Sequence, residues 1–147
     1  MTDDYAKYER KCNQIIKRNK KLISYFEEEL LKRGLSRKTV DRHIVNVELY
    51  INDYLLRTDA QPMEEGLNEI NAYLGWYVIE KFIPVSPNLI RSFAASLKKF
   101  YKCMAEAGEI EKESCDEFCR FIKDNMECWA EYCNQYNNPD APSPFMC

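Results

Sequence analysis

The sequence contains little glycine and only one histidine. Its 147 residues include 4 Gly and 1 His, against 10 Tyr, 7 Phe and 2 Trp. Scarce glycine together with many aromatic residues is typical of a folded, mainly helical chain rather than a disordered one. The length suits one domain with a substantial core. We therefore expect a single all-α bundle over residues 1–137, followed by a disordered Pro-rich tail over residues 138–147.

The motifs that usually carry catalysis are missing. The chain has no Gly-rich phosphate loop, no pair of metal-binding histidines and no Gly-x-Ser-x-Gly elbow. The single histidine, His43, borders the apolar face of its predicted helix, which favours a partly buried structural role. The sequence thus predicts a protein that is not an enzyme and uses no cofactor.

No apolar segment indicates secretion or membrane insertion. The N-terminus, Met1-Thr2-Asp3-Asp4, is acidic and polar, and the longest apolar run, around residues 74–79, is far shorter than a membrane span. We expect a cytoplasmic protein without a membrane partner. In that compartment its seven cysteines should be thiols rather than a disulfide framework.

Four cysteines near the C-terminus suggest a metal site that helix geometry argues against. On one straight helix Cys119 and Cys128 would lie about 13 Å apart, whereas four thiolates on one zinc ion lie within roughly 4 Å of each other. Cys115, Cys119 and Cys133 instead fall on or beside the apolar line of their helix. We therefore expect buried thiols and no bound metal.

Charge is distributed unevenly, although the net charge is only −3. Residues 7–43 contain 12 Lys or Arg against 5 Asp or Glu, whereas residues 106–147 contain 3 against 10. The small net charge excludes a globally basic nucleic-acid binder. The opposite charges of the two segments predict that they pair within one chain or between copies in a homo-oligomer.

Hydrophobic periodicity predicts five helices. They cover residues 3–33, 36–56, 67–82, 86–108 and 109–137. The fourth has both ends marked, since Ser86 is a good N-cap, Pro87 suits the first helical position and Gly108 suits a left-handed residue after the end. We expect one shared core that includes Val47, Ile51, Leu74, Phe93, Leu97 and Phe100.

Two of the predicted helices carry a cationic face. The face of helix 86–108 opposite its apolar stripe contains Arg91, Lys98 and Lys102, with Lys99 beside them. No Asp or Glu occurs over residues 82–105. At the start of helix 36–56, Lys38 and Arg42 lie four residues apart, where the positive end of the helix dipole adds to their attraction for an anion. Both faces could also be ordinary solvated surface.

Two stretches share their order and spacing with a known domain. The first is Gly34-Leu35-Ser36-Arg37-Lys38-Thr39 with the amphipathic helix after it. The second is Ser86-Pro87, then Ser96-Leu97-Lys98-Lys99-Phe100-Tyr101 and Gly108-Glu109-Ile110. Together they resemble the N-terminal SAM-like (core-binding) domain of phage integrases and other tyrosine recombinases. The resemblance covers about residues 22–110.

In that family a small helical bundle clamps one face of the DNA duplex while a separate catalytic domain holds the other. The resemblance therefore implies double-stranded DNA as a partner. The residues that it points to are Ser36, Arg37, Lys38, Thr39, Arg42, Arg91, Ser92, Ser96, Lys98 and Lys99. Periodicity adds Lys102 to this set of expected DNA contacts.

The sequence departs from the family after residue 110. Where the family has an Asn-Pro that opens a linker, Glu111-Lys112-Glu113 continues into an acidic helix. The His-x-x-Arg motif and the setting of the nucleophilic tyrosine are absent, so the chain is not expected to cleave DNA. Two hypotheses remain: a non-catalytic DNA-binding module, or a protein-interaction or self-associating helical module that has lost DNA binding. The position of the acidic helix relative to Arg91, Lys98 and Lys102 should separate them.

Overall fold

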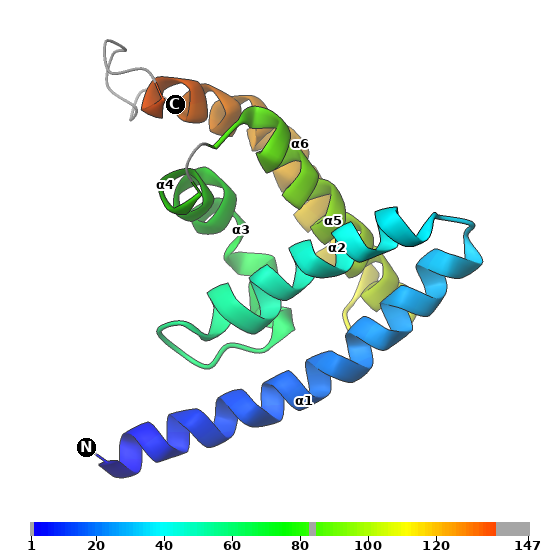
Figure 1. The fold of residues 1–147 in the computed structure, drawn as a ribbon, viewed down its shortest axis with the longest axis vertical. Coiled ribbons are helices and arrows are strands. Elements are labelled where there is room, and N and C mark those ends of the chain that lie inside the picture. The colour runs from blue at the N-terminus through cyan, green and yellow to red at the C-terminus, as the bar shows by residue number, and fades with distance from the viewer. Residues whose placement is uncertain (1, 83–84, 138–147) are drawn as a thin grey trace.

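The structure, a computed structural model, describes residues 2–82 and 85–137, and every element within these ranges is helical (Figure 1). In chain order the elements are α1 (Thr2–Lys32), α2 (Arg37–Glu48), the π-helix η1 (Leu49–Asp53), the 3₁₀ helices η2 (Tyr54–Leu56) and η3 (Met63–Asn68), α3 (Ile70–Ala72), the π-helix η4 (Tyr73–Tyr77), α4 (Val78–Lys81), α5 (Pro87–Glu106) and α6 (Lys112–Tyr136). The predicted all-α fold is confirmed. The predicted tail over residues 138–147 lies outside the described residues.

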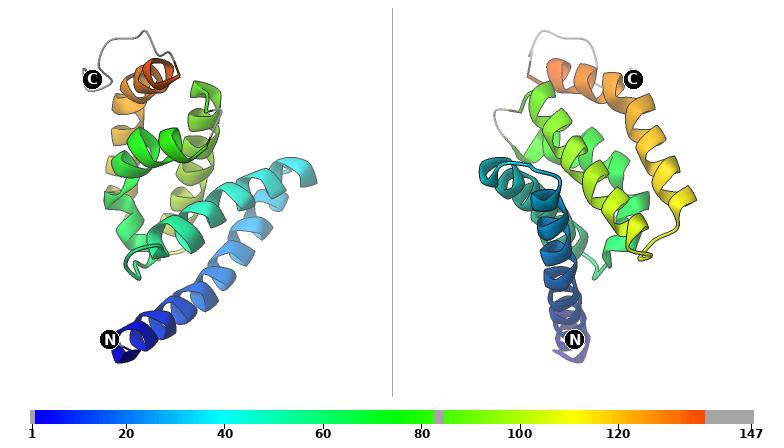
Figure 2. Two further views of the ribbon diagram at one scale, coloured as in Figure 1. Left: turned by 60° about the vertical axis from the view of Figure 1, so that its left-hand side comes forward. Right: turned by 90° about the vertical axis from the view of Figure 1, so that its right-hand side faces the viewer.

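Helix α5 lies at the centre of the bundle, where α2, α6 and the C-terminal half of α1 pack against it (Figure 2). Phe26 of α1 meets Phe100 edge-on, with ring centroids 5.4 Å apart, and Tyr101 packs against Phe118 of α6 at 4.7 Å. One buried cluster contains all of the predicted core residues Val47, Ile51, Leu74, Phe93, Leu97 and Phe100. A single hydrophobic core therefore holds these helices together.

Local capping sets the start of α2 and both ends of α5, and the caps of α5 are those that the sequence predicts. The Ser36 hydroxyl accepts a hydrogen bond from the Thr39 amide at 3.2 Å, and the Ser86 hydroxyl accepts one from the Leu89 amide at 3.1 Å. Gly108, with φ of 79°, adopts the left-handed conformation just after α5. These contacts satisfy backbone groups that a helix end would otherwise leave unpaired.

Two predicted helices are less regular than their periodicity indicates. The α-helix expected over residues 36–56 ends at Glu48 and continues as η1 and η2, and the helix expected over residues 67–82 begins as 3₁₀ turns and includes η4. A Cβ at Gly66 would lie 2.3 Å from the Tyr101 hydroxyl oxygen, and one at Gly75 would lie 2.7 Å from Nε1 of Trp129. At both glycines the backbone touches a side chain from another helix, so tertiary contact competes with regular helical geometry.

Helix α1 is buried along only part of its length, and its N-terminal turns project from the bundle (Figures 1 and 2). Tyr5 is 66% exposed, although periodicity places it on the apolar stripe. Full burial begins at Asn19, whose amide donates to the Ile51 carbonyl at 3.2 Å and to Oδ1 of Asn52 at 2.9 Å. The N-terminal half of α1 is thus only partly packed: Tyr8, Cys12 and Ile15 are half-buried, and the Tyr8 hydroxyl donates to the Leu56 carbonyl of η2. No helix in the described part of the chain combines the length and apolar character needed to span a bilayer.

Candidate nucleic-acid interface

The two helices that carry the predicted DNA contacts pack together through a polar network. Nδ1 of His43 lies 2.7 Å from Oγ of Ser96, and the Asn46 amide donates to Oγ of Ser96 at 2.9 Å and of Ser92 at 3.3 Å. The Ser96 hydroxyl in turn donates to the Ser92 carbonyl at 3.1 Å. Since that hydroxyl proton is already used, Nδ1 of His43 acts as the donor toward Ser96. The network fixes how α2 sits on α5.

Ser96 was predicted to contact DNA, and the structure shows that this prediction is wrong. Its side chain has no exposed surface, because α2 closes over it with His43 and Asn46. Helical periodicity places Ser96 at the border between the apolar and polar faces of α5. Whether a residue at that border is buried or exposed depends on the neighbouring helix, here α2. Ser96 is therefore a structural residue that holds α2 against α5.

Most of the other residues predicted to contact DNA are exposed to solvent. Exposed residues are Ser36, Arg37, Lys38, Arg42, Arg91, Lys99 and Lys102. Thr39, Ser92 and Lys98 are half-buried.

Arg42 of α2 and Lys99 of α5 converge near His43. Burial lowers the pKa of His43 below its ordinary value of 6.5, and the positive charges of Arg42 and Lys99 lower it further. Arg42 adjoins His43 in sequence, and Lys99 lies one turn after Ser96, the hydrogen-bond partner of His43, so both exposed cations flank the contact between α2 and α5. We name the exposed cations of these two helices, Lys38, Arg42, Arg91, Lys99 and Lys102, the α2–α5 cationic surface.

The charges of the α2–α5 cationic surface are not neutralised within the described part of the chain. None of its five cations forms an ion pair with a carboxylate of residues 2–82 or 85–137. Arg37 differs from them, because it pairs with Asp41 at 2.6 Å and with Glu27 of α1. Arg37 links α1 to α2, and its charge is already compensated.

The acidic helix α6 packs beside the α2–α5 cationic surface and does not cover it. Arg91, Lys99 and Lys102 stay exposed, while Lys102 borders a pocket of about 310 Å³ that Lys112 and Asp116 of α6 also line. The edge of α6 nearest this surface thus carries both signs of charge. The arrangement that would have opposed DNA binding most strongly, an acidic helix laid over these cations, is absent from the described fold.

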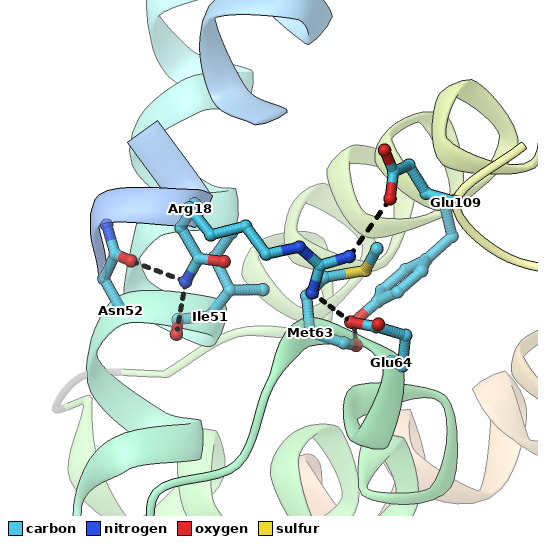
Figure 3. Close-up of polar contacts among 8 residues, drawn as sticks. Arg18, Ile51, Asn52, Met63, Glu64 and Glu109 are labelled. Atoms are coloured by element: carbon cyan, nitrogen blue, oxygen red, sulfur yellow. Dashed lines mark hydrogen bonds and ion pairs between the residues drawn. The ribbon is translucent and has the colours of Figure 1, made fainter. Parts of the chain in front are cut away.

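Ion pairs join the basic and acidic segments within one chain. Arg18 of α1 pairs with Glu64 at 2.7 Å and with Glu109 at 3.1 Å (Figure 3), and Arg33 pairs with Glu106 at 2.9 Å. Each of these solvent-accessible pairs contributes about 0–1 kcal/mol. Sequence reasoning missed the role of Arg18, because helical spacing does not show which of several basic residues on α1 meets a distant carboxylate.

Three cysteines of α6, namely Cys115, Cys119 and Cys133, lie in or pack against the hydrophobic core. Helix α6 runs unbroken through all four of its cysteines, and Cys115 and Cys133 are buried. Within residues 2–82 and 85–137 no group of three or more His, Cys, Asp or Glu side chains is placed to hold a metal ion. Burial raises the pKa of Cys115 to about 12 and that of Cys103 to about 11, so both thiols stay protonated near neutral pH.

Comparison of the chain with protein-family models, with curated proteins and with solved structures finds no match. The resemblance to the integrase core-binding domain therefore rests on the sequence motifs given above.

Proposed function

We propose that this chain is a non-catalytic DNA-binding module, related to the core-binding domain of site-specific recombinases. The observation that carries the proposal is that Arg42 and Lys99, from the two helices that the resemblance selects, flank the His43–Ser96 contact on one cationic surface without ion-pair partners in the described ranges. Buried hydrogen bonds of His43 and Asn46 hold these two helices in a fixed relation. The proposed site is thus presented on rigid elements.

The side chains available on the surface favour contact with phosphates over contact with bases. Lys38, Arg42, Arg91, Lys99 and Lys102 are cations, and the partly exposed hydroxyl of Thr39 lies beside them at the start of α2. Phosphate contacts position a protein on a duplex and carry little sequence information. We expect weak binding with little sequence preference. With about four or five phosphate contacts, affinity should fall roughly as the fourth power of salt concentration, about a hundredfold or more between 50 and 200 mM.

Charge reversal tests the proposal. The variant Arg42→Glu/Lys99→Glu should lose most duplex affinity, and its salt slope should fall by about two. Fluorescence anisotropy of a labelled duplex at about 50 mM salt measures both quantities. The matched control is Lys11→Glu/Lys20→Glu, which makes the same change in net charge at two exposed positions of α1. Equal losses in the two variants, or no binding by the unmodified protein, would reject the proposal.

A protein-interaction or self-associating module is the second candidate function. It is favoured by the outer side of α6, where Glu113, Glu117, Asp124, Glu127 and Glu131 are exposed. None of these carboxylates pairs with a cation in the described part of the chain. A duplex would be repelled by such a surface, whereas a basic protein surface would be attracted.

A further inference from the structure

Helix α1 carries a row of unpaired cations. Lys7, Arg10, Lys17 and Lys21 lie along one side of the helix, at successive steps of 3, 7 and 4 residues. All four are exposed, and none forms an ion pair within the described ranges. We call this row the α1 basic ridge. It points away from the core that Leu22 and Phe26 enter.

Helix α6 carries the complementary row. Glu113, Glu117, Asp124 and Glu127 lie along its outer side at steps of 4, 7 and 3 residues, which are the steps of the α1 basic ridge in reverse order. One exposed cation, Arg120, lies in this row between Glu117 and Asp124, and the reversed spacing sets it opposite the uncharged Gln14 of α1. The four carboxylates form the α6 acidic ridge. Two helices that run antiparallel bring residues together in reverse order. One register therefore matches Lys21 with Glu113, Lys17 with Glu117, Arg10 with Asp124 and Lys7 with Glu127.

The two ridges do not meet within one chain. Helices α1 and α6 pack on different sides of the bundle (Figure 2). The residues of both ridges are exposed. The contacts that do join the basic and acidic segments, Arg18 with Glu109 and Arg33 with Glu106, use residues outside the ridges. A second copy of the chain supplies a ridge of opposite charge and matching spacing.

We propose that copies of this protein associate head to tail, with the α1 basic ridge of one copy lying antiparallel on the α6 acidic ridge of the next. Because the two surfaces differ, each copy offers one of each, and association gives a ring or an open chain. The contact consists of solvent-accessible ion pairs, so it is weak and sensitive to salt. It is independent of the α2–α5 cationic surface and of DNA.

Sedimentation velocity on the full chain without DNA tests the proposal. At about 0.01 M salt, where the screening length is about 30 Å, the weight-average sedimentation coefficient should rise with protein concentration up to about 1 mM. It should return to the monomer value at about 1 M salt, where the screening length is about 3 Å. A monomer under both conditions would overturn the proposal.

A charge swap tests the pairing itself. Lys17→Glu/Lys21→Glu and Glu113→Lys/Glu117→Lys should each abolish association alone, and an equimolar mixture of the two variants should restore it. The variant Lys20→Glu/Lys81→Glu, which makes the same change in net charge at two exposed positions away from the α1 basic ridge, should associate as the unmodified chain does. Failure of the mixture to restore association, or equal loss in that control, would overturn the proposed pairing. Far-UV circular dichroism checks that each variant is folded.

The proposed register also predicts the effect of substitutions at one end of the contact. It brings Asp3 of α1 opposite Glu131 of α6, one pair of like charges beyond Lys7 and Glu127. Asp3→Lys should therefore strengthen association severalfold at low salt, and Glu131→Lys should do the same. Weaker or unchanged association in both variants would exclude this register.

Discussion

Nδ1 of His43 on α2 donates a hydrogen bond to Oγ of Ser96 on α5 across 2.7 Å, inside the contact that fixes the proposed DNA-binding surface. Protonation of the imidazole is disfavoured there, because burial and the nearby charges of Arg42 and Lys99 lower the pKa of His43. Folding therefore favours the neutral imidazole at this contact.

Acidification should destabilise the protein through His43. Its pKa is lower in the folded chain than in the unfolded chain, where it is near 6.5. The unfolded state therefore binds the proton first as pH falls. The free energy of unfolding should decrease from about pH 6.5 down to the folded pKa, by at most about 1.4 kcal/mol per pH unit from this group. Urea unfolding between about pH 5 and 8 measures it. His43→Gln should remove this component, and parallel curves for the two proteins would contradict the assignment.

Gly75 should not tolerate a side chain. A Cβ there would lie 2.7 Å from Nε1 and 2.8 Å from Cδ1 of Trp129, whose Nε1 donates to Oδ1 of Asn71 at 2.9 Å. Gly75→Ala should lower the free energy of unfolding by about 1–3 kcal/mol, as overpacking in a core does. Urea denaturation checks this value. In the background of Trp129→Phe, which removes the indole edge, the same substitution should cost less. An equal cost in both backgrounds would show that the contact is not the cause.

The cysteines should separate into two classes of reactivity. Burial raises the pKa of Cys103 to about 11 and that of Cys115 to about 12, and it also raises the pKa of Cys133. In the native protein near pH 8 these three thiols should resist a brief pulse of iodoacetamide. Cys12 and Cys119, which are half-buried, should be modified sooner. Peptide mass spectrometry after the pulse measures each site. The difference should vanish in denaturant, and early modification of Cys115 would contradict its burial.

Some features of this protein follow from short stretches of sequence. The helical fold, the limits of α5 and the members of the core were predicted, because Ser86, Pro87 and Gly108 act on the backbone next to them and because helical periodicity marks the buried face. The cationic side of α5 follows from the same periodicity. These are local properties, which the chain expresses largely without regard to its distant contacts.

Tertiary structure decided the rest. Whether Ser96 faces solvent depends on α2, and the regular helix expected over residues 67–82 is interrupted by η4, where Trp129 of α6 touches the backbone at Gly75. Both partners of Arg18, and Glu27 as one of the two partners of Arg37, likewise come from other segments of the chain. Periodicity assigns a residue to a side of its own helix, but the border of that side is set by the neighbouring helix that packs against it.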